Sequence, residues 1–373
     1  MNDDEILFYL VLSLAPGIGL PAKRRLLEVA GSAAAVIQRR KEWKALYPEL
    51  PDRFLAALDD GALRSRAEAE LRYCEEKQIR PLPFDDPAYP SRLRECDDAP
   101  LLLFYRGNAD LNALRILNLV GTRRATPYAQ DLIDHFVADL SARCPNTLVV
   151  SGLAYGVDIM AHRAALAHGL PTVGVLAHGL DRLYPAVHRH TAAQMMDHGG
   201  LLTEYPTGTN ADKPNFVARN RIVAGISDAT IVVESAAKGG ALITAGIAES
   251  YHRDCFAFPG RATDEYSLGC NRLIQHNQAA LLTSAEDFLE AMGWATAPVR
   301  RTDKPVQREL FPDVSPEEQQ VIHVLRQVED GLPVNILVVK AGLPIDRMMG
   351  ILFDLEMKGM VRALAGGIYR LIR

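Results

Sequence analysis

The sequence lacks the features of membrane, secreted and zinc-binding proteins. No window approaches the ~18–20 consecutive apolar residues of a membrane span, and the short apolar stretch near the N-terminus follows acidic residues, unlike a secretory signal. An odd number of cysteines without CxxC spacing fits a reducing compartment. The cysteines are Cys74, Cys96, Cys144, Cys255 and Cys270. These absences predict a soluble, cytoplasmic protein with no membrane partner.

Positive charge is not in excess. The chain has 41 Lys and Arg against 46 Asp and Glu, a net charge of −5, which argues against coating nucleic acid by bulk charge. A local basic groove remains compatible with this average. With 48% hydrophobic residues over 373 positions, the composition is that of a folded protein, and at roughly 100–200 residues per domain we expect two or three domains.

Several enzyme motifs are absent. The sequence has no GxxxxGK[ST] of P-loop NTPases, no GxGxxG followed by an acid ~20 residues later, and no GxSxG nucleophile elbow. His188, His190 and His198 have no carboxylate or cysteine at a spacing that completes a metal site. We therefore predict no metal, no cofactor and no catalytic residue. Asp158 and His162, at i and i+4, allow two interpretations: an acid/base pair, or a helix start supported by Asp158 with His162 packed behind it.

Residues 1–78 have the apolar periodicity of helices. Pro16-Gly17-Ile18-Gly19 separates two of them and precedes the basic residues Lys23, Arg24 and Arg25. This pattern predicts a helix-hairpin-helix (SAM-like) domain. Its glycines either let backbone amides approach a phosphate or simply close a helical hairpin, and the sequence leaves both alternatives open.

Residues 79–293 alternate apolar, β-rich runs with helical segments. The runs are 116–120, 147–150, 172–176 and 230–233. Near-continuous apolar strands separated by helices predict a mainly parallel sheet covered on both faces. The expected fold is an α/β, Rossmann-like, doubly wound domain whose ligand lies beyond the carboxyl ends of the strands.

The C-terminal part begins with a linker over 294–314, rich in proline and charge. Residues 315–373 predict a winged helix, with Ser315 capping the first helix, two further helices at 335–341 and 345–358, and a hairpin turning at Gly366-Gly367. This domain has seven Lys and Arg against seven Asp and Glu. Because a duplex-reading domain should be distinctly basic, this balance favours protein contact or regulation.

Glycine-rich turns follow the predicted strands of the central domain. They lie at 121–124, 151–158, 179–185 and 238–245, one with arginines and another with Lys238. Backbone amides at such turns and at helix N-termini bind anions, so four of them at one sheet edge predict a phosphate-lined pocket.

The segment 205–225 is locally basic. It carries Lys213, Arg219 and Arg221 against Asp212 alone, with Phe216 three residues before the first arginine. Charge for phosphates and a ring for a base are the two elements of single-strand binding. The alternative places Phe216 in the core and uses the arginines to cap the loop.

These motifs, in this order, resemble the DNA-processing protein A family (DprA, also called Smf) over nearly the whole chain. The similarity rests on the VGTR, SGLAYGVD, GLDRLYP, TEYPTG, FVARNRIVAG, GGALITA, CFAFPG and GCNRLI segments. The resemblance implies single-stranded DNA binding, a homodimer formed through the Rossmann-like domain, and loading of RecA onto protected DNA during natural transformation, without enzymatic activity.

The resemblance also implies roles for individual residues. Arg123 would contact phosphate, and Lys213, Phe216, Arg219 and Arg221 would line the path of the strand. Gly152 and Gly156 would let the strand approach the backbone, and the same motifs supply Asn220, Lys238 and Gly240. The sequence departs from the family pattern at Thr122, Thr203, His188 and where Gly239-Gly240 replaces the start of SGA.

Two other functions are compatible with the sequence. Gly239-Gly240, Thr244 and Glu249 echo the PGGxGTxxE motif of nucleoside-monophosphate phosphoribohydrolases, with stretched spacing and without the proline. A hydrolase acting on nucleotides is therefore the alternative. A protein-interaction scaffold, with the winged helix recruiting a partner, is compatible with DNA binding.

Overall fold

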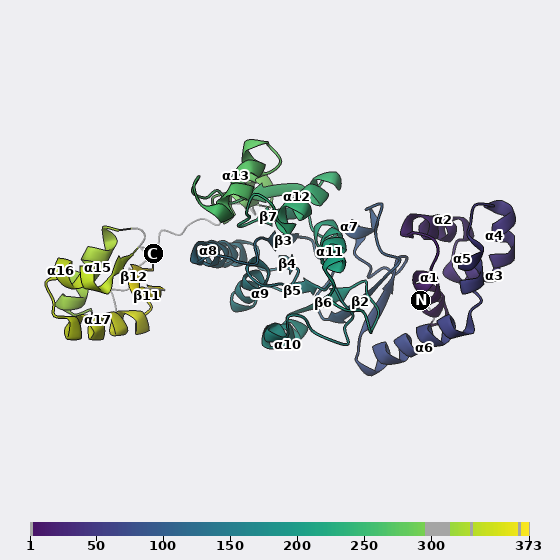
Figure 1. The fold of residues 1–373 in the computed structure, drawn as a ribbon, viewed down its shortest axis with the longest axis horizontal. Helices are drawn as coiled ribbons and strands as arrows, with labels where there is room; N and C mark the ends of the chain where they lie inside the picture. Colours follow the sequence, from purple (N-terminus) through teal and green to yellow (C-terminus); the bar gives the residue numbers. More distant parts are fainter. Residues whose placement is uncertain (1–2, 295–313, 329–330, 365–366, 373) are drawn as a thin grey trace. The chain divides into compact units, whose positions relative to one another are not determined.

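The computed structural model describes residues 3–294, 314–328, 331–364 and 367–372 (Figure 1). The chain forms two compact units, 1–297 and 298–373, which are described here one at a time. The predicted linker, 294–314, lies almost entirely outside the described residues.

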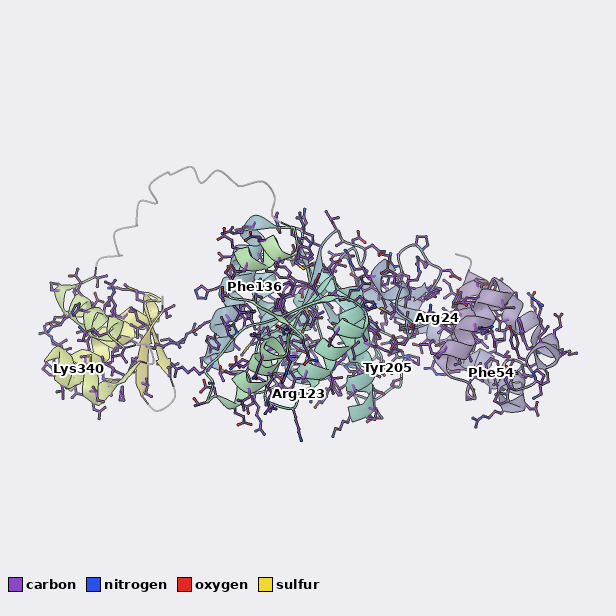
Figure 2. The ribbon with its side chains drawn as sticks, turned by 90° about the horizontal axis from the view of Figure 1, so that it is seen from above. Arg24, Phe54, Arg123, Phe136, Tyr205 and Lys340 are labelled. Atoms are coloured by element: carbon purple, nitrogen blue, oxygen red, sulfur yellow. The ribbon has the colours of Figure 1, made fainter. Side chains whose placement is uncertain are left out.

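The first unit begins with a layer of helices, as predicted. They are α1 (Asp3–Leu14), α2 (Leu20–Ala30), α3 (Ala33–Gln38), α4 (Arg40–Leu46), α5 (Asp52–Ala57) and α6 (Gly61–Glu76). Trp43 and Phe54 are fully buried among them, and Figure 2 labels Phe54. Their core also includes Leu102 and Phe104 of β2 (Leu102–Gly107), so the helices pack directly on one edge of the sheet. The boundary predicted near residue 78 therefore does not separate two compact units.

The helical hairpin uses two of its three cations internally. Lys23 is 8% exposed, and its Nζ donates to the carbonyl oxygen of Ser13 at 2.8 Å. Burial lowers the pKa of Lys23 to about 8. Arg24 donates to the carbonyl oxygens of Cys96 and Asp97, both at 2.7 Å. These contacts favour a hairpin that packs on the sheet over one that binds phosphate.

The sheet of the first unit has nine strands in the order β1-β2-β6-β5-β4-β3-β7-β8-β9. Neighbouring strands from β6 to β9 in this order are parallel. Strand β2 is antiparallel to both of its neighbours, β1 and β6. The strands besides β2 are β1 (Arg80–Pro83), β3 (Ile116–Val120), β4 (Leu148–Ser151), β5 (Thr172–Val175), β6 (Gly199–Thr203), β7 (Ala229–Val232), β8 (Asp254–Ala257) and β9 (Ala280–Leu281). The mainly parallel, doubly wound sheet is confirmed, and each predicted apolar run forms a strand.

Helices cover both faces of the sheet, because side chains alternate along each strand. Ile116 of β3 faces one layer and Leu117 faces the other. The first layer contains α7 (Ser91–Arg94), α11 (Lys213–Ile226), α12 (Gly240–Ser250) and α13 (Leu268–Gln275). The second contains α8 (Pro127–Arg143), α9 (Val157–Ala167) and α14 (Ala285–Ala291). A smaller cluster forms around α10 (Arg189–Asp197).

The second unit is a winged helix, as predicted. It contains α15 (Pro316–Arg326), β10 (Leu332–Pro333), α16 (Val334–Ala341), α17 (Ile345–Met357), β11 (Val361–Leu364) and β12 (Ile368–Leu371). Ser315 caps α15 in a capping box with Glu318. Glu318 also pairs with Lys358 at 2.7 Å, which ties the start of α15 to the end of α17. The hairpin turn lies partly outside the described residues.

Candidate nucleic-acid interface

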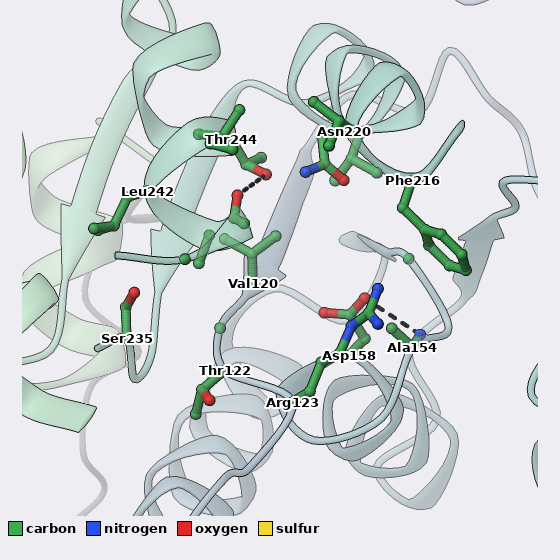
Figure 3. A pocket seen from close by; sticks show the side chains of 18 of the residues that line it. Val120, Thr122, Arg123, Ala154, Asp158, Phe216, Asn220, Ser235, Leu242 and Thr244 are labelled. Atoms are coloured by element: carbon green, nitrogen blue, oxygen red, sulfur yellow. Dashed lines mark hydrogen bonds between the residues drawn. The ribbon is translucent and has the colours of Figure 1, made fainter. Parts of the chain in front are cut away.

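A cavity of about 1120 Å³ opens at the carboxyl ends of β3, β4 and β7 (Figure 3). The chain leaves β3 towards β4 on one side and returns later to β7 on the other. Open α/β sheets bind ligands at such a switch in strand order. Three of the four predicted glycine-rich turns line the cavity, those after β3, β4 and β7, together with the first turns of α11 and α12.

The third turn contributes differently. A Cβ at Gly179 would lie 2.5 Å from the carbonyl oxygen of Pro206, so this glycine allows two loops to pack closely. From that turn only Tyr184 reaches the cavity.

Carboxylates of the chain already occupy two of the expected anion sites. The buried Glu234 accepts from the backbone N–H of Thr126 at 2.9 Å and from its hydroxyl at 2.5 Å, at the start of α8. Asp158, in the first turn of α9, accepts from the backbone N–H of Ala154 at 3.3 Å (Figure 3). Negative groups favour helix N-termini, so the protein itself satisfies these two.

The starts of α11 and α12 remain open to a ligand. No side chain of the described chain caps either helix N-terminus. The exposed side chains of Lys213 and Lys238 line the cavity at these positions, together with Gly240. Two uncapped N-terminal turns and two cations form a site suited to phosphate oxygens.

Arg123, on the turn after β3, and Phe216, in the first turn of α11, line the cavity close to each other (Figure 3). The Arg123 guanidinium carbon lies 4.8 Å from the centroid of the Phe216 ring, within the range of a cation–π contact. Tyr184, which is 46% exposed, contacts the edge of the same ring, with centroids 5.8 Å apart. Phe216 is therefore half-buried on the wall of the cavity rather than a core residue.

Arg219 lines the floor of the cavity and also supports it. It is only 3% exposed, and its Nη1 donates to the carbonyl oxygen of Gly152 at 2.6 Å and also to that of Val175. These bonds join the ends of β4 and β5. Burial lowers the pKa of Arg219, opposed by nearby Asp158. The guanidinium is thus largely committed to the backbone, unlike the exposed Arg123.

The two glycines expected to admit a DNA backbone have other neighbours. A Cβ at Gly152 would lie 2.4 Å from the Arg219 guanidinium. A Cβ at Gly156, whose φ of +75° favours glycine, would lie 2.2 Å from the carbonyl oxygen of Thr122. At each glycine the missing Cβ makes room for a part of the chain itself, and the approach of a DNA strand to these two glycines stays a prediction. Gly152 still contributes to the cavity floor.

Arg221 lies away from the cavity lining. Its Nη2 pairs with the carboxylate of Glu204 at 2.5 Å, and its side chain is 15% exposed. Along α11, residues 219 and 221 point about 200° apart, since each residue turns the helix by ~100°. Arg219 lines the cavity and Arg221 does not, so the prediction that both line the path of one strand agrees with this cavity for Arg219 alone. Asn220, in contrast, does line the cavity.

Asp158 and His162 do not form an acid/base pair. The Thr172 hydroxyl donates to the carbonyl oxygen of Val149 at 2.9 Å, so it accepts from His162 Nδ1 at 2.7 Å. His162 Nε2 is buried and has no hydrogen-bond partner among the described residues. Burial lowers the pKa of His162 to about 3 and raises that of Asp158. The second interpretation, a supported helix start with a packed histidine, is the one observed.

The sequence did not single out Tyr184 and Ser235 as site residues, yet both line the cavity. Each belongs to a loop directly after a strand, and that position was the available signal. Glu249 of the hydrolase alternative is exposed on the last turn of α12. It lies about 13 Å along the helix axis from Gly240, given a rise of 1.5 Å per residue.

Across the described ranges, His, Cys, Asp and Glu side chains form no group of three or more that could hold a metal ion. No helix in the same ranges is long and apolar enough to cross a membrane.

The fold and the cavity define a Rossmann-like protein with a glycine-lined cavity that carries Arg123, Lys213 and Lys238, followed by a winged helix. Residues 80–293 match the family model described as DNA recombination-mediator protein A. Residues 305–367 match the model of the DprA winged helix domain. The chain belongs to the DNA recombination-mediator protein A family, DprA or Smf, as the sequence motifs indicated.

Known relatives support this assignment. Protein Smf of Escherichia coli is 33% identical over 314 residues, covering 83% of this chain and 82% of the relative. The X-ray structure of DNA processing protein A from Streptococcus pneumoniae has a TM-score of 0.57 and 31% identity, covering 74% of this chain and 98% of that one. A structure of the Helicobacter pylori protein, described for its single-stranded DNA binding mode, has a TM-score of 0.52 and 28% identity, covering 58% of this chain and 96% of that one.

Proposed function

We propose that this protein is a non-enzymatic recombination mediator that binds single-stranded DNA in the cavity beyond β3, β4 and β7. The supporting observation is the arrangement of Arg123, Lys213 and Lys238, three exposed cations around two uncapped helix starts. Phosphates would lie against these cations and the turn at Gly240. Affinity would then fall with salt, because each neutralised phosphate releases counterions.

The wall of the cavity suits an unpaired base. Phe216 has a guanidinium over its ring and Tyr184 at its edge. A base that stacks on Phe216 in place of the Arg123 guanidinium would contribute ~1–3 kcal/mol. Because stacking requires an exposed base face, we expect single strands to bind much more tightly than duplexes.

Family membership carries the remaining parts of the proposal. The protein would act in the cytoplasm as a homodimer formed through its Rossmann-like domain, protect incoming DNA, and load RecA during natural transformation. Light scattering of the pure chain tests the dimer. Stimulation of RecA filament growth on strands coated with single-strand-binding protein tests the loading step.

The direct test of the binding site compares an oligothymidylate with a duplex of equal length, using the full chain at about 50 mM and about 200 mM salt. We expect preference for the single strand and a clear loss of affinity at higher salt. Equal affinity for both forms would contradict the proposal.

The hydrolase alternative is tested with the same preparation. Glu249 lies too far along α12 to share a substrate with the first turn of that helix. Incubation with AMP should therefore release no adenine. Turnover that is lost on Glu249→Gln would establish the hydrolase.

A further inference from the structure

The second unit carries an exposed apolar stripe on α17. Ile345, Met349, Phe353 and Met357 are exposed by 51%, 46%, 63% and 73%, respectively. They recur every four residues, which places them along one side of the helix. We call these four residues the α17 stripe.

The stripe is additional to the core of the unit. The buried side of the same helix consists of Met348, Ile351, Leu352 and Leu355. A surface helix normally has one apolar face towards the core and a polar face outside. Single exposed apolar residues are ordinary, but a continuous row marks an interaction surface.

Acidic residues border the α17 stripe. Asp346, Asp354 and Glu356 are exposed on the same helix. Its one arginine, Arg347, pairs with Glu317 of α15 at 2.8 Å. Phosphates would meet negative charge here, so this face does not fit duplex DNA, although α16 and α17 have the order of a helix-turn-helix in which the second helix reads bases.

We propose that the α17 stripe docks an amphipathic helix of a partner protein, whose apolar face is bordered by Lys or Arg. Charge complementarity selects this occupant, because basic borders would lie against Asp346 and Asp354. A second copy of the chain would place the same acids against each other and be repelled. Methionines adapt to varied apolar surfaces, and Phe353 offers a large aromatic anchor at the centre of the stripe.

The test uses two labelled helical peptides with the same leucine face, one with lysine borders and one with glutamate borders. Against the full chain at low salt, the lysine-bordered peptide should bind and the glutamate-bordered peptide should not. Phe353→Ser combined with Met357→Ser should weaken binding by about tenfold or more, as expected for central anchors. Leu114→Ser, at a residue of the first unit that is 83% exposed, is the matched control and should change nothing.

A charge reversal gives the sharper readout. Asp346→Lys with Asp354→Lys should switch the preference to the glutamate-bordered peptide, and both positions are exposed, so folding is preserved. Equal binding of the two peptides, an unchanged serine variant, or failure of the switch would overturn the proposal. A mass of the full chain in solution that falls in the serine variant would also overturn it, by making the stripe an interface between copies. Single-stranded DNA binding is not needed for any of these outcomes.

Discussion

The cavity of the first unit and the α17 stripe of the second are opposite in chemistry. The cavity combines exposed cations with uncapped helix starts and polar backbone, and its own carboxylates are committed to neighbouring N–H groups. The α17 stripe combines apolar side chains with exposed acidic borders. One surface suits phosphate, whereas the other repels it.

This difference explains how a protein with a net charge of −5 can have a nucleic-acid site. Negative charge outside the cavity disfavours indiscriminate coating of DNA, and the winged helix is neutral in total. In the proposed function, DNA binding would depend on a few residues around one cavity, so substitutions at these residues can test the comparison.

The largest expected effect is a difference in stability between substitutions at the floor of the cavity and at its rim. Arg219→Ala would leave the carbonyl oxygens of Gly152 and Val175 without this donor and should lower the free energy of unfolding by ~2–4 kcal/mol. Arg123→Ala, at an exposed position, should change it by less than ~0.5 kcal/mol. Urea unfolding of both variants measures this. Equal midpoints would show that Arg219 does not support the fold.

The second effect concerns stacking on the rim. Phe216→Ala should weaken binding of an oligothymidylate by ~1–3 kcal/mol, while Phe216→Trp, which keeps an aromatic face, should bind nearly as well as the parent. Fluorescence anisotropy at one fixed salt concentration gives both values. Wild-type affinity of the alanine variant would place the bases elsewhere.

The third effect concerns the buried side chain of His162. The pKa of His162 is about 3 in the folded protein, against an ordinary value of 6.5. Between these values the unfolded chain binds more protons, so stability falls as pH decreases below 6.5, by up to ~1.4 kcal/mol per pH unit. His162→Asn keeps a donor for Thr172 but cannot titrate, so its unfolding free energy should depend less on pH across this window. Parallel pH profiles of the two proteins would refute the assignment.

The smallest expected effect tests whether the two surfaces act separately. Phe353→Ser with Met357→Ser should leave the affinity for single-stranded DNA within about twofold, because the proposed DNA site belongs to the first unit and the α17 stripe to the second. An affinity measurement under the conditions used for Phe216→Ala is sufficient. A loss beyond about fivefold would mean that the α17 stripe takes part in DNA binding.

Much of the fold was predictable because it follows from periodicity. The apolar runs 116–120 and 172–176 became central parallel strands, and Ser315 caps α15 as expected. The cavity was predictable as a place, since the carboxyl ends of parallel strands meet at one edge.

Side-chain direction was harder to predict. The sequence alone does not distinguish Arg123 from Arg219, yet Arg123 is exposed and Arg219 is buried at the ends of the strands. Two contacts depend on residues distant in sequence: Gly152 makes room for Arg219, and Glu234 accepts from Thr126 at the start of α8. A single sequence does not encode such pairings locally, so they became visible only in the folded arrangement.

The most direct test of the central claim is the salt dependence of single-stranded DNA binding by Arg123→Ala and Arg124→Ala. Both arginines are exposed on the same turn, but only Arg123 lines the cavity. Loss of one phosphate contact should reduce the slope of log K against log salt by about 0.7 in Arg123→Ala and weaken binding at low salt, while Arg124→Ala keeps the parental slope. Identical slopes and affinities for the two variants would contradict a DNA site in this cavity.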